Sequence, residues 1–229
     1  MEFLKANWFL LLMLLIASAL VFVWLYFFNK EKLNAKWWEL LIVTIIHTGY
    51  GVLTVKFFAL LEAGFVFEKA GNMSLFGAIF FMPIMYIAYA LVKKLPVGLV
   101  FDTFVVPLAA TLALARINCL YAGCCQGIEL GSSGFKWPAR EFDIATHVSF
   151  LVFSVPWIIK GKSKGMGYPL YLITYGAFRF INEWFRESES PNPFHLSHIW
   201  SIISILIGIA SIIIINIRQK KGALGNENN

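Results

Sequence analysis

The residue that most constrains the chemistry of this chain is Arg116, which lies near the end of a long apolar run. The stretch 115–127 reads Ala-Arg-Ile-Asn-Cys-Leu-Tyr-Ala-Gly-Cys-Cys-Gln-Gly, so small residues follow the arginine. A guanidinium group keeps its proton at physiological pH, and an unpaired charge in hydrocarbon costs about 2.5 kcal/mol or more. Arg116 must therefore have a carboxylate partner, a water-filled cavity or a ligand, which makes it a candidate functional residue.

Further polar side chains from four apolar segments are expected at a similar depth. They are Lys56, Glu62, Asn118, Arg140, Asp143, His147, Arg179, Glu183 and Arg186. The spacing of four between Asp143 and His147 places both on one face of a helix. Arginines next to the backbone N–H groups of the glycine-rich stretch 122–142 would form a site for an anionic headgroup. The alternative is a structural network in which Glu183 pairs with an arginine and only locks the helices together.

Two histidines are candidate proton acceptors. His147 and His198 are expected near the outer surface, where an imidazole can accept a proton near neutral pH. The alternative for each is a solvated histidine at the membrane interface. His47 stands alone at mid-depth and is expected to hydrogen-bond to a neighbouring helix. The chain contains no glycine-rich nucleotide loop followed by lysine, no His-Glu-x-x-His and no Gly-x-Ser-x-Gly motif.

The composition is typical of a polytopic membrane protein. Of 229 residues, 59% are hydrophobic and 14% are charged, and the mean hydropathy is +0.72. Soluble domains carry about a quarter charged residues. The net charge of +6 does not indicate nucleic-acid binding, because the basic residues are scattered between apolar runs and form no basic face.

Seven apolar segments are expected to cross the membrane as helices. They cover residues 8–28, 38–61, 73–92, 97–121, 144–159, 168–184 and 199–217. Most are long enough to cross about 30 Å at about 1.5 Å per residue, and the short fifth segment is expected to extend back into 140–143. No linker interrupts the chain. We therefore predict an all-α fold with a single transmembrane domain over residues 1–229, in which the outer loop 122–142 forms part of the site.

The distribution of basic residues predicts the orientation. The loops after the first, third and fifth segments and the C-terminus carry eleven Lys and Arg residues, and the N-terminus and the other loops carry five, namely Lys5, Lys69, Lys136, Arg140 and Arg186. Because cytoplasmic loops are enriched in basic residues, the N-terminus is expected outside and the C-terminus in the cytoplasm. The polar side chains described above then lie in the outer half of the membrane.

The cysteines and several glycines are expected to serve packing. Cys119, Cys124 and Cys125 lack the paired C-x-x-C spacing of a zinc site, and adjacent cysteines close a disulfide only with strain. They are expected to be small buried residues, and no metal or cofactor is predicted. Small residues let helices approach closely in lipid, so close helix contacts are expected at Gly49, Gly51, Gly64 and Gly77.

Five short blocks, in order along residues 40 to 215, resemble the prolipoprotein diacylglyceryl transferase family. The stretch 115–127 is very close to the signature variant Gly-Arg-Ile-Gly-Cys-Phe-x-x-Gly-Cys-Cys-x-Gly. The other blocks are 101–107, then 137–143, which is like Pro-Ser-Gln-Leu-Tyr-Glu, then 175–186, which is like Tyr-Gly-x-x-Arg-Phe-x-x-Glu-x-x-Arg, and 198–201, which is like Gln-x-x-Ser.

The resemblance implies an enzyme that transfers the diacylglyceryl group of phosphatidylglycerol to the lipobox cysteine of a prolipoprotein. The site would face outward in the cytoplasmic membrane of a bacterium, with the lipid bilayer as its surroundings. Arg116 and Arg179 would bind the phosphate, whose charge grows as glycerol phosphate leaves, and Glu183 would orient them. The residues assigned to substrate binding are Asn118, Tyr121, Gly123, Arg140, Asp143 and Arg186.

Three positions depart from the family pattern. Phe76 stands where the family has a histidine often assigned to catalysis, and Arg140 and His198 each replace a glutamine. The group that activates the acceptor thiol is therefore expected to be His147, His198 or Glu183. Two alternatives remain: a silent relative that binds an anionic phospholipid without turnover, and an anion transporter, which the few polar residues of the inner half disfavour.

Overall fold

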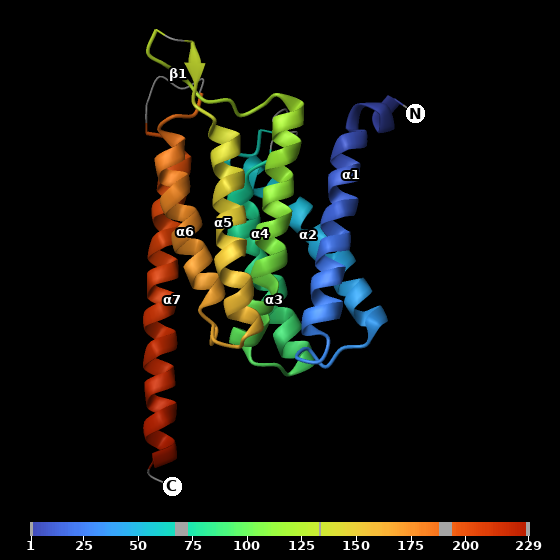
Figure 1. Cartoon of the computed structure of the whole chain (residues 1–229), viewed down its shortest axis with the longest axis vertical. Helices are drawn as coiled ribbons and strands as arrows, with labels where there is room; N and C mark the ends of the chain where they lie inside the picture. Colours follow the sequence, from blue (N-terminus) through green and yellow to red (C-terminus); the bar gives the residue numbers. More distant parts are fainter. Residues whose placement is uncertain (1, 67–72, 133, 188–193, 228–229) are drawn as a thin grey trace.

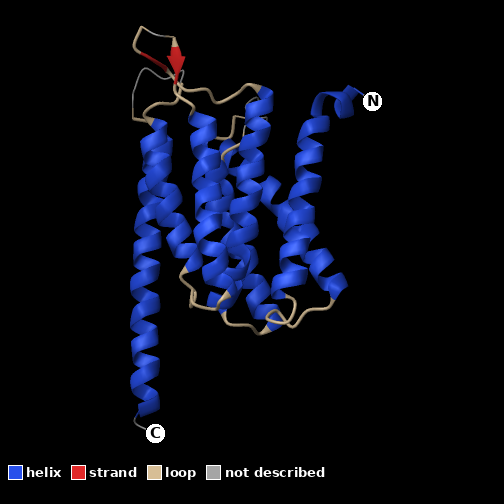
Figure 2. Cartoon of the chain, viewed as in Figure 1, coloured by secondary structure: helices blue, strands red, loops and turns tan. Residues whose placement is uncertain are grey.

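The computed structural model describes residues 2–66, 73–132, 134–187 and 194–227, with side chains described from residue 8 to residue 220 of these ranges. Its helices are α1 (Glu2–Val23), which continues into the π-helix η1 (Trp24–Asn29), α2 (Trp37–Glu62), α3 (Leu75–Lys93), α4 (Val97–Ala122), α5 (Ala139–Ile159), α6 (Gly167–Glu183) and α7 (Leu196–Glu227). Two short strands, β1 (Glu129–Leu130) and β2 (Phe135–Lys136), pair antiparallel between α4 and α5 (Figure 2). Of the basic residues counted for orientation, Lys69 lies outside the described residues and Lys5 has no described side chain.

The seven predicted spans are confirmed as helices, which lie side by side in one bundle (Figure 1). In the described part of the chain, six of them are long and apolar enough to cross a membrane, and α6, with 17 residues, is shorter. The fifth helix begins at Ala139, as its expected extension predicts, and the seventh continues beyond its predicted end to Glu227. The start of α1 and the β1–β2 hairpin lie at one end of the bundle, and α7 ends at the other (Figure 1).

The end of α4 is set by Gly123, which has φ +71°. Glycine adopts this left-handed conformation without a Cβ penalty, so the chain turns directly after the helix. The side chain of Gln126 donates from Nε2 to the carbonyl oxygen of Gly123 at 3.1 Å and supports the turn. Arg116 therefore lies within two helical turns of a loop that folds back at the same end of the bundle.

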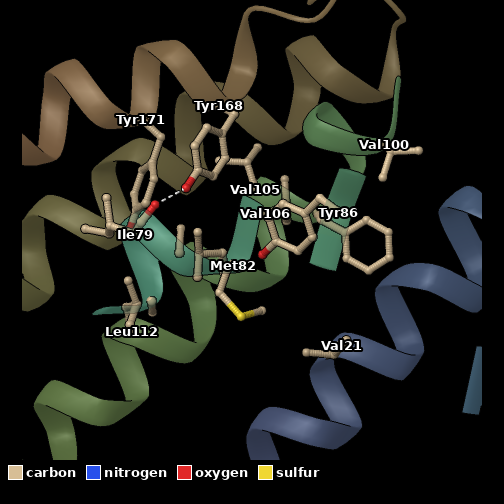
Figure 3. Close-up of a cluster of buried hydrophobic side chains, with 14 of the residues drawn as sticks. Val21, Ile79, Met82, Tyr86, Val100, Val105, Val106, Leu112, Tyr168 and Tyr171 are labelled. Atoms are coloured by element: carbon tan, nitrogen blue, oxygen red, sulfur yellow. Dashed lines mark hydrogen bonds between the residues drawn. The ribbon is translucent and has the colours of Figure 1, made fainter. Parts of the chain in front are cut away.

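Aliphatic and aromatic side chains together fill the centre of the bundle (Figure 3). Tyr86, Tyr168 and Tyr171 are almost fully buried, and the Tyr168 hydroxyl donates to the carbonyl oxygen of Ile79, which links α6 to α3. His47 Nε2 lies 3.2 Å from the Tyr86 hydroxyl oxygen, which links α2 to α3. The expected hydrogen bond between His47 and a neighbouring helix is therefore confirmed.

Asp102 joins α4 to the start of α6 at the end of the bundle away from the hairpin. Its Oδ2 accepts hydrogen bonds from Ser163 Oγ and from the Gly165 N–H, both at 2.6 Å, and its Oδ1 accepts one from the Gly167 N–H at 2.7 Å. A carboxylate at the start of a helix satisfies unpaired N–H groups and complements the helix dipole. This structural role of Asp102 was not predicted from the sequence.

Close helix contacts occur at only some of the predicted glycines. Gly77 is confirmed, because a Cβ there would lie 2.1 Å from the carbonyl oxygen of Thr54. The prediction is wrong for Gly49 and Gly64, where a Cβ would meet nothing within 4 Å, and Gly51 makes only an ordinary contact at 3.9 Å. Gly64 lies instead in a turn with φ +64°. The close approach of α2 and α3 is therefore at Gly77.

We expect Gly77→Ala to lower the free energy of unfolding by about 1–3 kcal/mol, because overpacking would force α2 and α3 apart. The matched control is Gly49→Ala, whose methyl group has open space and whose helix propensity is higher by about 0.5–1 kcal/mol. Thermal unfolding of the purified protein in detergent compares the two variants. Equal melting temperatures would contradict the packing at Gly77.

Candidate functional site

A buried carboxylate, Asp143 on α5, joins two arginines from different helices. Its Oδ2 lies 2.8 Å from Nε of Arg116 on α4 and 3.1 Å from Nη1 of Arg179 on α6. All three side chains are at most 7% exposed. The two guanidinium groups that were expected at one depth therefore meet at one carboxylate.

The charges continue from this carboxylate toward the end of the bundle. Glu183 Oε2 lies 2.5 Å from Nη2 of Arg179 and 3.6 Å from Nη1 of Arg186. The Arg186 side chain is 23% exposed, whereas that of Glu183 is 8% exposed. We call these five residues, Arg116, Asp143, Arg179, Glu183 and Arg186, the arginine cluster. It alternates cations and carboxylates from the interior to the surface.

Arg116 keeps hydrogen-bonding capacity within this cluster. Its Nε–H is close to Asp143 Oδ2 but is not directed at it, so the contact is an ion pair without hydrogen-bond geometry. Among the described residues, neither terminal nitrogen of Arg116 makes a hydrogen bond. A guanidinium group presents its donors in a planar fork that matches a phosphate. Arg116 can therefore bind an anionic oxygen without leaving Asp143.

Asn182 holds Asp143 in place, and the sequence analysis missed it. Its Nδ2 lies 2.8 Å from Asp143 Oδ1 and 2.8 Å from the Ala139 carbonyl oxygen, and its Oδ1 accepts a hydrogen bond from Trp137 Nε1 at 2.8 Å. Asn182 is fully buried. Its spacing of three from Arg179 places both on one face of α6, which is the signal that could have found it.

His147 lies one helical turn deeper than Asp143 and is fully buried. Its Nδ1 is 3.0 Å from the Tyr171 hydroxyl oxygen, and its ring stacks on Tyr175 with the ring centroids 5.3 Å apart. Its Nε2 has no hydrogen-bond partner. The alternative of a solvated histidine at the surface is therefore wrong for His147, because the aromatic rings of α6 enclose it. It interacts electrostatically with Asp143 and with both buried arginines.

Tyr175 is a second residue that the sequence analysis missed. It is 1% exposed, its hydroxyl has no hydrogen-bond partner, and it interacts electrostatically with Arg116 and Arg179. Phe76, which stands at the position of the family histidine, packs edge-on against Tyr175 with the ring centroids 5.6 Å apart. Tyr175 also stacks on His147, so one aromatic ring separates Phe76 from a histidine. Tyr175 is the first residue of the block 175–186, and its place in this family-like block is the sequence feature that could have identified it.

Among the residues that the structure describes, His198 forms no ion pair with the arginine cluster, and aromatic rings enclose it. The rings of Phe180, Trp184 and Phe194 lie with their centroids 4.7 to 5.1 Å from that of His198. Its Nδ1 accepts a hydrogen bond from the His195 N–H at 3.0 Å, and its side chain is fully buried. The alternative of a solvated histidine is therefore wrong here as well.

The other predicted substrate-binding residues lie outside the arginine cluster. Tyr121 stacks on Phe9 of α1, with the ring centroids 4.0 Å apart. Arg140 donates from Nη1 to the carbonyl oxygen of Cys124 at 3.5 Å and forms no ion pair in the described part of the chain. Asn118 lines the cavity described next. Of the predicted substrate-binding residues, Asp143 and Arg186 thus lie in the cluster, and Asn118, Tyr121, Gly123 and Arg140 lie beside it.

A largely apolar cavity of about 250 Å³ lies between α1, α2, α3 and α4. Its polar lining includes His47, Lys56 and Asn118, and Ala115 contributes to its wall. Ala115 directly precedes Arg116, so the cavity reaches the turn of α4 that carries the arginine. An apolar cavity with a few polar groups is typical of a site for a lipid or another small molecule.

These features define the chain as a multi-pass α-helical membrane protein with a buried arginine–carboxylate cluster near one end of its bundle. The sequence model of the prolipoprotein diacylglyceryl transferase family matches residues 2–214. The chain belongs to this family, and the predicted resemblance to a family of transferases is confirmed.

Individual relatives agree with this family. The chain is 31% identical over 180 residues to phosphatidylglycerol–prolipoprotein diacylglyceryl transferase 2 of Clostridium perfringens. This alignment covers 70% of this chain and 68% of the relative. It is 26% identical over 210 residues to the phosphatidylglycerol–prolipoprotein diacylglyceryl transferase of Dehalococcoides mccartyi. This second alignment covers 81% of this chain and 80% of the relative. No solved structure gives a significant match.

We expect Asp143→Asn to lower the free energy of unfolding by about 3–5 kcal/mol, because it leaves two buried guanidinium groups without their shared carboxylate. Asparagine keeps the size of the side chain, so the loss reports the charge. The control is Glu129→Gln, which removes an exposed carboxylate from β1. Thermal unfolding in detergent measures both variants, and an unchanged melting temperature for Asp143→Asn would show that the ion pairs do not stabilise the bundle.

Proposed function

We propose that this chain transfers the diacylglyceryl group of phosphatidylglycerol to the cysteine thiol of a prolipoprotein, the reaction named by its relatives. The observation that carries the proposal is the convergence of Arg116 and Arg179 on Asp143, where the terminal nitrogens of Arg116 make no hydrogen bond with any described residue. Two guanidinium groups held close together, with N–H donors that make no other hydrogen bond, can bind the phosphate of a phosphodiester. The apolar cavity beside Ala115 offers space for part of an acyl chain.

The reaction requires a leaving group to gain charge. The acceptor sulfur would form a C–S bond to the glyceryl carbon while the C–O bond to phosphate breaks, and glycerol phosphate would leave with one more negative charge than the diester. Arg116 and Arg179 would stabilise this growing charge more than the initial phosphate, which lowers the barrier. Asp143 would keep both guanidinium groups in place before the lipid arrives.

The proton of the acceptor thiol requires a base, and the geometry favours His147 among the three candidates. Glu183 already contacts two arginines. Both histidines are buried among aromatic rings with Nε2 unpaired, but His147 lies one helical turn from Asp143, which joins Arg116 and Arg179. We therefore assign the proton transfer to His147, with Tyr171 orienting its ring.

We further propose that the cluster faces the outer leaflet of the bacterial cytoplasmic membrane. The loops at the hairpin end carry few basic residues, as expected for the side opposite the cytoplasm. The cluster lies at this same end of the bundle, since Arg186 bridges to Gly127 in the loop that carries the hairpin. A secreted precursor would present its cysteine there.

The test is an assay of the purified protein with phosphatidylglycerol and a lipobox peptide, with thioether product detected by mass spectrometry. Arg116→Lys and Arg179→Lys keep the charge but lose the planar fork, and each should lower kcat by about 100-fold or more. Arg218→Ala, at the opposite end of the bundle, is the control. Absence of product from the unaltered protein would support the silent relative that only binds lipid, and unchanged activity of both lysine variants would refute the assigned phosphate contacts.

The base is tested by His147→Gln and His198→Gln in the same assay. We expect His147→Gln to lower kcat by about 100-fold at neutral pH, the scale typical of a lost general base. The loss should shrink as the pH rises above about 8.5, where a thiol ionises without help. His198→Gln should change kcat only a few-fold at any pH. The opposite pattern would assign the proton transfer to His198.

A further inference from the structure

The three cysteines of the chain lie in one cluster beside the arginines. Cys119 belongs to the last turn of α4, and Cys124 and Cys125 belong to the turn that follows Gly123. Their Sγ atoms all lie within 4.8 Å of one another, and none of them is in a disulfide. Cys119 precedes Cys124 by five residues and Cys125 by six, so the turn folds back over the end of the helix to bring the sulfurs together.

The expectation that these cysteines are small buried packing residues is wrong for Cys124, which is exposed, and Cys119 and Cys125 are only half-buried. Cys125 also has φ +60°, a left-handed conformation that residues with a Cβ adopt rarely. Apolar packing explains neither the exposure nor this conformation. With this backbone conformation, the Sγ atom of Cys125 lies next to those of Cys119 and Cys124.

The sulfur positions suit a metal ion. A Zn–S bond of about 2.3 Å in tetrahedral geometry places the sulfurs about 3.8 Å apart. The cluster therefore needs to contract by at most about 1 Å to bind an ion with all three. Among the described residues, no histidine, carboxylate or further cysteine joins this group, so the donor set is three sulfurs. Thiolate donors select soft ions such as Cu⁺ and Zn²⁺.

Two guanidinium groups lie near the sulfurs, since Arg116 and Arg186 both interact electrostatically with Cys125. Three thiolates with Zn²⁺ carry one net negative charge, and with Cu⁺ they carry two. The neighbouring guanidinium groups can balance either complex.

We propose that Cys119, Cys124 and Cys125 bind one thiophilic metal ion and so fasten the 123–127 turn to the end of α4. This departs from the sequence analysis, which predicted no metal. Cys119 lies three residues after Arg116, and Gly127 bridges to Arg186, so the ion holds the loop that connects both ends of the arginine cluster. The site binds metal whether or not the chain transfers a diacylglyceryl group, so it is independent of the proposed function.

The test uses the full-length protein in detergent, reduced and freed of metal by a chelator. Zn²⁺, Cu⁺ and Cd²⁺ are titrated separately, with the sulfur-to-cadmium charge-transfer band and the bound metal per chain as readouts. We expect one ion per chain, protection of the thiols from maleimide, and at least tenfold weaker binding in Cys119→Ser, Cys124→Ser and Cys125→Ser. The matched control is Gln126→Ala, which alters the same turn but removes no sulfur and should bind metal normally.

Maleimide protection in the unaltered protein keeps the proposal testable even where a serine variant folds poorly. The relative affinities of the titrated ions show which metal the site prefers. Three sulfurs complete the coordination of Cu⁺, whereas Zn²⁺ would need a water molecule as its fourth ligand. Less than a tenth of an ion per chain would overturn the proposal. So would metal binding that survives all three serine substitutions, or thiols that close a disulfide on air exposure while metal offers no protection.

Discussion

A guanidinium group cannot be neutralised in hydrocarbon, and this constraint organises the functional end of the bundle. Arg116 and Arg179 are both nearly buried, and each needs an acid within a few ångströms. Asp143 serves both at once. Because the three residues come from α4, α6 and α5, the ion pairs require these helices to pack within the reach of one side chain.

The rest of the bundle keeps Asp143 at this meeting point. Asn182 binds its second carboxylate oxygen and the backbone at the start of α5, and Trp137 fixes Asn182 in turn. At the opposite end, Asp102 on α4 accepts hydrogen bonds from the residues that begin α6. The helices that carry the arginines are thus joined at both ends, and their relative rotation is set before any ligand binds.

Periodicity and charge predicted the seven spans, the depth of the polar residues and the shared faces, because these depend on position along a single helix. The pairing depends on how neighbouring helices rotate, which no single segment encodes. The sequence predicted that Glu183 pairs with Arg179 or Arg116. The pairing with Arg179 on the same helix is confirmed, whereas Arg116 pairs with Asp143 on another helix. For the same reason, the roles of Asn182 and Asp102 were missed, since both act across helices or onto a distant backbone.

A network that only locked the helices together would be most stable with every donor and acceptor satisfied. Here several buried polar groups at or next to the arginine cluster have no hydrogen-bond partner, among them Nε of Arg116, the Tyr175 hydroxyl and Nε2 of His147. Leaving buried polar groups without partners costs about 1–3 kcal/mol each. A purely structural cluster could remove these groups without loss, so their presence beside two fixed cations favours a site that a ligand completes. The ion pairs and the binding site then have one origin, because the carboxylate that stabilises the cations also holds them ready for an anion.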